Sequence, residues 1–200
     1  MAGAKRKIVL ASSSKYRAEL LRKAGIDFTI IKPDCDEDID SGLSVEEAVM
    51  EIAKRKMSDV DRRVEDSIII AGDQMMEFEG RAVGKAGNPE KALELLMALS
   101  GKSHRLLTSL IVKDQKTGRV LSHLDVHGFK TRKYSVEEAR RYIEIERPFD
   151  CTGALKIESR GILLIESVEG RDYTAIIGLP MIKLISFLNQ LGYNPLVRRD

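Results

Sequence analysis

The sequence predicts an α/β fold built on a mixed β-sheet. Helix-like and strand-like segments alternate along the chain, which is typical of the α/β class. The run SIIIAG at residues 67–72 is apolar and short, as expected of a buried central strand. Two further strand-like segments, 105–113 and 119–126, follow each other through the short sequence DQKTG. Strands joined by so short a connection pair antiparallel, so we expect a mixed sheet rather than a purely parallel one.

The helices and strands of the first half have local signals in the sequence. Gly25 is expected to end the first helix, because glycine readily adopts the left-handed conformation found there. Ser44 and Glu47 have the spacing of a capping box for the second helix, and Pro89 favours the first turn of the third. The predicted elements are a strand at 7–11, a helix at 14–24, a strand at 28–32, an acidic loop at 33–42, a helix at 44–60, a strand at 67–72, a hairpin turning at 79–80 and a helix at 88–99.

The second half continues the alternation. Ser135 and Glu138 form a second capping box, and the helix they begin must end before Pro148. The run GILLIESVEG at 161–170 predicts a strand. Pro180 stands at the start of a last helix, predicted at 181–191.

Composition limits the class of protein. The chain has 200 residues, 43% of them hydrophobic, which suits one domain with or without two lobes. Charged residues make up 32%, but the net charge is only +2, which argues against a nucleic-acid binder. An RNA-binding sheet is also disfavoured, because no strand carries a cluster of aromatic residues. No apolar run approaches membrane-spanning length, so no membrane partner is expected.

The cysteines and histidines give no metal-binding pattern. Cys35 and Cys151 lie far apart and lack metal-ligand spacing. They are expected to be free thiols in a reducing cytosol, which predicts a cytoplasmic protein. The histidines do not cluster with them, so we expect no structural zinc site.

The segment LASSSKYRAELL places three serines between a strand and a helix, followed by Tyr16 and Arg17 in the first helical turn. A helix N-terminus has free N–H groups and a partial positive charge, which suit a phosphate group. The alternative is that a serine simply caps the helix, which is common.

Lys56 and Asp73 are two further candidates. Lys56 lies on the apolar stripe of the helix at 44–60. Its ammonium group either reaches past the core into solvent or points into a cleft, where it would suit phosphate. Asp73 follows the central strand, and ligands of open α/β sheets bind beyond such carboxyl ends. An aspartate that only forms a turn is the alternative.

Loop residues complete the set of charged candidates. Lys85 lies between two glycines, which admit a ligand close to the backbone but also simply mark loops. Glu37 and Glu158 lie in loops, where a solvated surface charge is the alternative. Cations together with carboxylates suit a nucleoside triphosphate bound with a divalent cation, which takes oxygen ligands. No Walker A pattern is present, so a P-loop enzyme is not expected.

Five blocks of sequence together resemble the Maf family of nucleotide pyrophosphatases, in order from about residue 8 to residue 196. They are LASSSKYRAELL, EIAKRKM, IIIAGDQMMEFEGRAVGK, LMALSGKSHRLLTSL and GRDYTAIIGLPMIKL. The resemblance implies a single domain over residues 1–200 with two lobes, an extended mixed β-sheet flanked by helices and a central cleft, as in the inosine triphosphate pyrophosphatases. It also implies hydrolysis of a nucleoside triphosphate to the monophosphate and pyrophosphate, with Mg²⁺ or Mn²⁺ as cofactor.

The resemblance assigns roles to residues. It implies that Asp73 is the proton acceptor. It also implies that the other catalytic residues, which would neutralise phosphate charge, are Arg17, Lys56 and Lys85. By the same resemblance Ser12 would bind a phosphate, and the metal ligands would be Glu37 and Asp73.

Three positions resemble the branch of the family that acts on 7-methyl-GTP, namely Tyr16, Gln74 and Glu158. Another branch, which acts on dTTP and UTP, has arginine, threonine and glutamine there. Methylation makes guanine cationic, and an aromatic face attracts a cation. Glu158 would accept hydrogen bonds from the N1–H and amino group of the base.

Some residues depart from the family pattern. Lys15, Ala18 and Ala86 stand where the family has proline, arginine and proline. These departures bear on loop rigidity and phosphate affinity more than on the reaction.

Two alternative functions are a dTTP/UTP pyrophosphatase and a nucleotide-binding regulatory module that does not hydrolyse, although Asp73 disfavours the second. A homodimer also stays open, since the apolar residues Leu184, Phe187 and Leu188 suit either a core or a dimer surface.

Overall fold

The computed structural model describes residues 6–39 and 42–197. Residues 40 and 41 of the predicted acidic loop therefore lie outside the described residues, as do both ends of the predicted domain 1–200. Residue contacts divide the chain into two compact units. The first unit takes in the chain up to Asp73, Thr108–Asp125 and the chain from Asp172 onward, and the second takes in Gln74–Leu107 and Val126–Arg171.

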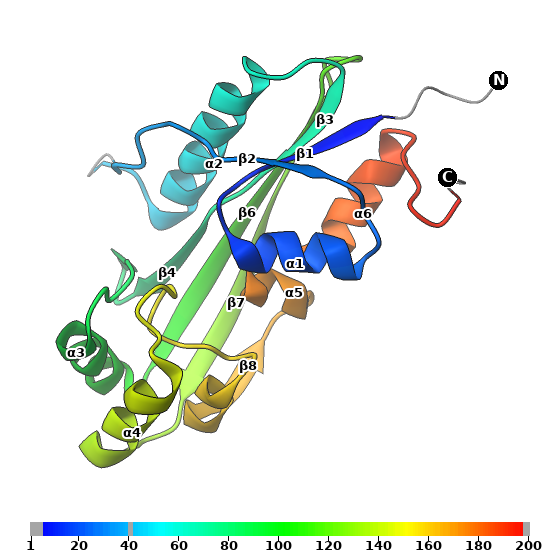
Figure 1. Cartoon of the computed structure of the whole chain (residues 1–200). Coiled ribbons are helices and arrows are strands. Elements are labelled where there is room, and N and C mark those ends of the chain that lie inside the picture. Colours follow the sequence, from blue (N-terminus) through cyan, green and yellow to red (C-terminus); the bar gives the residue numbers. More distant parts are fainter. Residues whose placement is uncertain (1–5, 40–41, 198–200) are drawn as a thin grey trace. The chain divides into compact units, whose positions relative to one another are not determined.

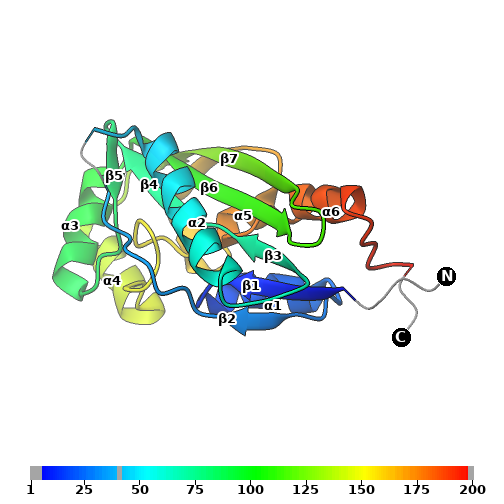
Figure 2. The ribbon, with the colours of Figure 1, turned by 90° about the horizontal axis from the view of Figure 1, so that it is seen from above.

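The first unit contains a mixed sheet with helices on both faces (Figures 1 and 2). β1 runs parallel to both of its neighbours, and β3 pairs antiparallel with β6, so the predicted mixed sheet is confirmed. In sheet order the strands are β2 (Thr29–Ile31), β1 (Lys7–Ala11), β3 (Ser67–Ala71) and β6 (Ser103–Asp114), whose second half belongs to this unit. The helices are α1 (Lys15–Lys23), α2 (Val45–Asp61), α5 (Tyr173–Ile177) and α6 (Met181–Gln190).

Alternation along β1 separates two cores in the first unit. Ile8 and Leu10 belong to the core that includes the apolar sides of α1 and α6. Val9 and Ala11 belong to a second core, with α2. Three apolar residues of α6 were predicted to lie either in a core or on a dimer surface. All three belong to the first of these cores: Leu184 is 0% exposed, Phe187 5% and Leu188 0%.

The second unit also combines strands and helices. Its hairpin turns at Glu79 and Gly80, as predicted, and both have positive φ angles, +51° and +76°. Such angles match the twist of a two-residue hairpin. The elements are β4 (Gln74–Phe78), β5 (Arg81–Val83), α3 (Pro89–Leu99), the first part of β6, the second part of β7 (Val120–Thr131), α4 (Val136–Glu146), a 3₁₀ helix (Arg160–Leu164) and β8 (Ile165–Glu169).

The helix-end signals are confirmed in the structure. Both predicted capping boxes form, at Ser44 with Glu47 and at Ser135 with Glu138. Gly25 follows the end of α1 with φ at +66°, and Ile26 N donates to the Leu21 carbonyl across it, as in a Schellman motif.

The prediction of one strand over 161–170 is wrong in its first half. Residues 160–164 form a 3₁₀ helix, and the strand begins at Ile165. Gly161 N donates to the Lys156 carbonyl at 2.9 Å, so the chain turns back on itself there. An apolar run of this length does not distinguish helix from strand by periodicity. The short helix α5 was not predicted either; Asp172 caps it by accepting from Thr174 N.

The strands β6 and β7 are longer than predicted, beginning at Ser103 and ending at Thr131. The added part of β7 pairs with β8, and polar residues there obscured the strand pattern. Among the described residues, none of the helices combines the length and apolar character that crossing a membrane requires.

Candidate functional site

Asp73 lies directly beyond β3, and Ser109 of β6 holds its main chain. Ser109 Oγ accepts a hydrogen bond from Asp73 N at 2.8 Å, and Ser109 N donates to the Asp73 carbonyl at 2.9 Å. Gly72 permits this approach, because a Cβ atom there would lie 2.3 Å from the Ser109 carbonyl oxygen. The main-chain position of Asp73 is therefore fixed at both of its polar groups.

Lys56 turns its ammonium group toward two carboxylates. The residue is 7% exposed, and Nζ lies 2.7 Å from Asp73 Oδ1 and 2.8 Å from Glu37 Oε2. It does not reach past the core into solvent, which was one of the two predicted alternatives. Lys56 instead links α2, the end of β3 and the acidic loop within the first unit.

Arg17 is buried beside the N-terminus of α1. Its Nε donates to the Gly178 carbonyl at 2.7 Å, and Nη1 donates to Ser12 Oγ at 3.1 Å. Burial lowers the pKa of Arg17, while the charges of Asp73 and Glu37 act in the opposite direction. The guanidinium group therefore lies within electrostatic reach of the same carboxylates that Lys56 contacts.

Ser12 and Ser14, at the start of α1, have different roles, which the sequence could not separate. Ser14 is the N-cap, since its side chain accepts from Arg17 N at 3.4 Å. Ser12 is 4% exposed and accepts from Ser14 N and from Arg17, each at 3.1 Å. Capping thus accounts for Ser14 and leaves Ser12 with a hydroxyl proton to donate.

Tyr16 is half-buried and already has a cation at its ring. The Lys15 ammonium group lies 5.3 Å from the ring centroid. A cation at this distance is attracted by the negative face of an aromatic ring.

The remaining predicted residues belong to the second unit. Gln74 is the half-buried first residue of β4, and Lys85 is exposed and pairs with Thr152 in an isolated β-bridge. Glu158 is exposed, in the turn before the 3₁₀ helix. The structure thus brings together, in the first unit, Ser12, Arg17, Glu37, Lys56 and Asp73.

A metal ion at this site would need oxygen ligands from the carboxylates. No group of three or more His, Cys, Asp or Glu able to hold a metal occurs in residues 6–39 and 42–197. Glu37 and Asp73 supply two carboxylates directed at one ammonium group. Mg²⁺ is commonly bound by one or two carboxylates, with substrate phosphates and waters as the other ligands. The residues fit a cation that binds together with a phosphorylated ligand.

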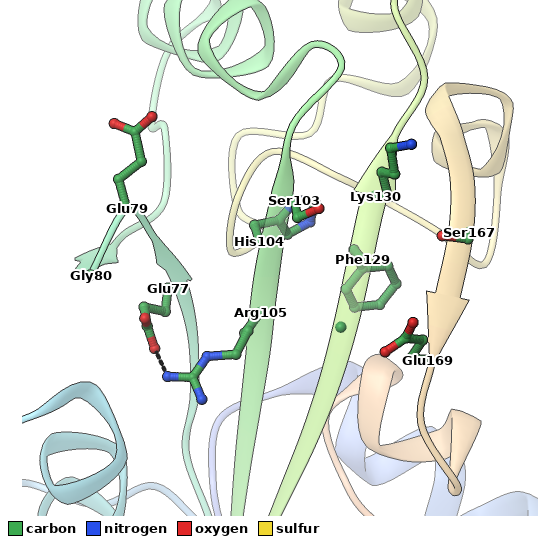
Figure 3. Close-up of a pocket in the computed structure, with 11 residues that line it drawn as sticks. Glu77, Glu79, Gly80, Ser103, His104, Arg105, Phe129, Lys130, Ser167 and Glu169 are labelled. Atoms are coloured by element: carbon green, nitrogen blue, oxygen red, sulfur yellow. Dashed lines mark hydrogen bonds and ion pairs between the residues drawn. The ribbon is translucent and has the colours of Figure 1, made fainter.

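A separate cavity of about 530 Å³ lies in the second unit, lined by residues of β4, β6, β7 and β8 (Figure 3). Arg105 and Glu77 form an ion pair on its wall. His104 also lines it, at 4% exposure, stacked 5.3 Å from Phe129 between ring centroids. Neither ring nitrogen of His104 has a partner in the described part of the chain. None of the predicted site residues lines this cavity.

The sequence prediction missed the residues that hold the site in place. Ser109 had a weak signal, as one of two hydroxyl residues within the otherwise apolar run LLTSLIV of β6. Gly72 and Gly178 act through backbone space and a carbonyl oxygen, which leave no chemical signal in a sequence.

Fold and site define an α/β protein in which two buried cations, Arg17 and Lys56, meet carboxylates at the end of a central strand. The family described as Maf-like protein matches residues 7–191. The chain belongs to the Maf-like protein family, and the resemblance seen in the sequence is confirmed.

Relatives extend over nearly the whole chain. A 7-methyl-GTP pyrophosphatase of Syntrophotalea carbinolica is 38% identical, covering 92% of this chain and 94% of its own. One of Bdellovibrio bacteriovorus is 35% identical, covering 90% and 94%. A dTTP/UTP pyrophosphatase of Caldicellulosiruptor saccharolyticus is 39% identical, covering 94% and 96%. All three are named as nucleotide pyrophosphatases, a class of hydrolase, but their named substrates differ.

Proposed function

We propose that this member of the Maf family is a nucleoside triphosphate pyrophosphatase that prefers 7-methyl-GTP. One observation carries the proposal: two buried cations, Arg17 and Lys56, accompany the carboxylate of Asp73 at the carboxyl end of a central strand. The names of the relatives support the same class of reaction.

In this proposal Asp73 accepts a proton from the attacking water. The water oxygen bonds to the α-phosphorus, and the bond from that phosphorus to the bridging oxygen breaks. The products are the nucleoside monophosphate and pyrophosphate. A positioned general base typically contributes about 10²–10⁴-fold to such a step.

The cations neutralise the charge that develops on the departing pyrophosphate. We assign this role to Arg17, Lys56 and Lys85. Ser12 donates its hydroxyl proton to a phosphate oxygen, since its oxygen already accepts from Arg17 and Ser14 N. Of these residues, Lys85 is assigned by the family resemblance alone.

Glu37 and Asp73 are proposed to hold Mg²⁺ or Mn²⁺ together with the phosphates of the substrate. A bound divalent cation would supply further neutralisation of phosphate charge. The same two carboxylates pair with Lys56, so the lysine keeps them close together before substrate binds.

The base is proposed to be recognised by Tyr16, Gln74 and Glu158. An aromatic face attracts a cation, so the ring of Tyr16 suits a cationic base such as 7-methylguanine. The Lys15 ammonium group, 5.3 Å from the ring centroid, would have to give way to the base. A dTTP/UTP pyrophosphatase is the second candidate, because a relative with that name is 39% identical.

A substrate panel tests the proposal. Pyrophosphate release with Mg²⁺ is measured for 7-methyl-GTP, GTP, dTTP, UTP and CTP, and EDTA is expected to abolish it. We expect the highest kcat/KM for 7-methyl-GTP. The triple variant Tyr16→Arg, Gln74→Thr, Glu158→Gln should shift the ranking toward dTTP and UTP. An unchanged order of kcat/KM values would show that other residues recognise the base. If no nucleotide gave pyrophosphate, the proposed pyrophosphatase activity would be refuted.

A further inference from the structure

The hydroxyl group of Ser109 joins two elements of the first unit. Ser109 is 0% exposed. Its Oγ accepts from Asp73 N at 2.8 Å and donates to the Val49 carbonyl of α2 at 2.9 Å. One buried hydroxyl thus serves as acceptor for the residue after β3 and as donor to α2.

Lys56 belongs to α2, and Asp73 follows β3, so Ser109 contacts both sides of the Lys56–Asp73 ion pair. On α2 it contacts Val49, which lies about two turns from Lys56 and therefore on the same side of the helix. Beyond β3 it contacts Asp73 itself. Lys56 Nζ and Asp73 Oδ1 are 2.7 Å apart, and a pair so little exposed is stabilising only with good geometry. A tie between α2 and the end of β3 preserves that geometry.

We propose that Ser109 is a positioning residue for the Lys56–Asp73 pair. Its hydroxyl group holds the main chain of Asp73 against α2, and it acts through Asp73 rather than on the substrate. The inference rests on the proposed function, in which Asp73 is the proton acceptor. Without the hydroxyl, Asp73 N loses its acceptor, and the bond from Ser109 N to the Asp73 carbonyl is the main-chain contact between these two residues that stays. The carboxylate is then held less firmly against Lys56.

Ser109→Ala tests the role by kinetics. We expect kcat to fall about 10- to 100-fold, since small misplacements of a catalytic group carry such costs. KM should stay within about threefold, because the phosphate-binding cations are unchanged.

Ser67→Ala is the matched control. Ser67 is 1% exposed, lies at the opposite end of β3 from Asp73, and donates from Oγ to the Glu65 carbonyl at 2.9 Å. Both substitutions remove one buried hydroxyl, and we expect both to lower the urea midpoint of unfolding. Only Ser109→Ala should lower kcat. Equal kcat values for the two variants would overturn the proposal.

A second pair of variants covers the case in which Ser109→Ala does not fold. Ser109→Thr and Ser109→Val have side chains of the same shape, and only the first keeps the hydroxyl group. We expect kcat of the threonine variant to exceed that of the valine variant at least tenfold. Equal values would show that the hydroxyl has no positioning role.

A double-mutant cycle separates this inference from the proposed function. The urea midpoints of Ser109→Ala, Lys56→Met and the double variant are compared. If Ser109 positions the ion pair, its loss should matter less once Lys56 is gone, so the shifts should not add. Additive shifts would overturn the proposal. The urea midpoints do not depend on catalysis. They therefore test the role of Ser109 even if the nucleotide panel shows no pyrophosphatase activity.

Discussion

The main chain of Asp73 is held by Ser109, and its side chain pairs with Lys56. A substitution can therefore change the carboxylate without removing the main-chain contacts. Ser109 holds both main-chain groups, and Lys56 contacts Oδ1. An amide of the same shape leaves the main-chain contacts in place, and Lys56 keeps Glu37 as a partner.

Asp73→Asn is therefore expected to slow the hydrolysis of the nucleotide while leaving nucleotide binding nearly unchanged. Pyrophosphate release in single turnovers should fall about 10²–10⁴-fold, since the amide cannot accept the proton. The nucleotide Kd should stay within a few fold. Asp61→Asn is a control in the same unit, because Asp61 also pairs with a lysine, at 2.5 Å from Lys113 Nζ. Near-normal turnover of Asp73→Asn would refute its role as base.

At the scale of elements, α2 is held at its first turn as well as along its buried side. Ser44 Oγ accepts from Glu47 N at 3.2 Å, and Glu47 Oε2 accepts from Ser44 N at 2.9 Å. The bonds that the Glu47 carboxylate accepts from Ser44 N and from Ser44 Oγ, each at 2.9 Å, lower the pKa of Glu47. Lys56 lies several turns from this cap, and Ser109 contacts the helix between them.

Ser44→Ala should lower the free energy of unfolding without lowering kcat. Loss of an N-cap serine costs about 1 kcal/mol of unfolding free energy. Ser135→Ala removes the equivalent cap of α4 and should cost a similar amount, measured by urea unfolding. We expect kcat of both variants within twofold of the unsubstituted chain. A tenfold loss in Ser44→Ala alone would mean that the cap, and not the buried side of α2, sets the position of Lys56.

At the scale of the whole molecule, we expect a histidine outside the candidate site, His104, to reduce stability in acid. Burial lowers the pKa of His104 from 6.5 to about 4. Between these values the unfolded chain binds a proton that the folded chain does not, so stability falls as the pH drops from about 6.5 to 4. The full difference corresponds to about 3 kcal/mol.

Replacing His104 by phenylalanine should flatten this part of the pH profile. The new ring can still stack on Phe129, and it cannot be protonated. The unfolding free energy of both proteins is measured between pH 4 and 7, and an NMR titration of the His104 ring should give a midpoint near 4. Equal slopes in the two proteins would assign the acid sensitivity to other groups.

The sequence by itself determined the fold class, most helix boundaries and the types of residue in the site. Strand length, capping boxes and turn residues are local properties, so the helix starts at Ser44 and Ser135 and the turn at Glu79–Gly80 were predictable. The apolar run at 161–170 was not, because periodicity does not separate a 3₁₀ turn from a strand over so few residues.

Only the tertiary structure decided what the charged residues do. Sequence could not choose between a solvated Lys56 and one paired with Asp73, because the choice depends on how α2 packs beside β3. It likewise could not show that Ser14 caps α1 while Ser12 serves Arg17, or that Ser109 holds Asp73. These contacts join residues far apart in the chain or depend on local geometry, so they exist only once the first unit is packed.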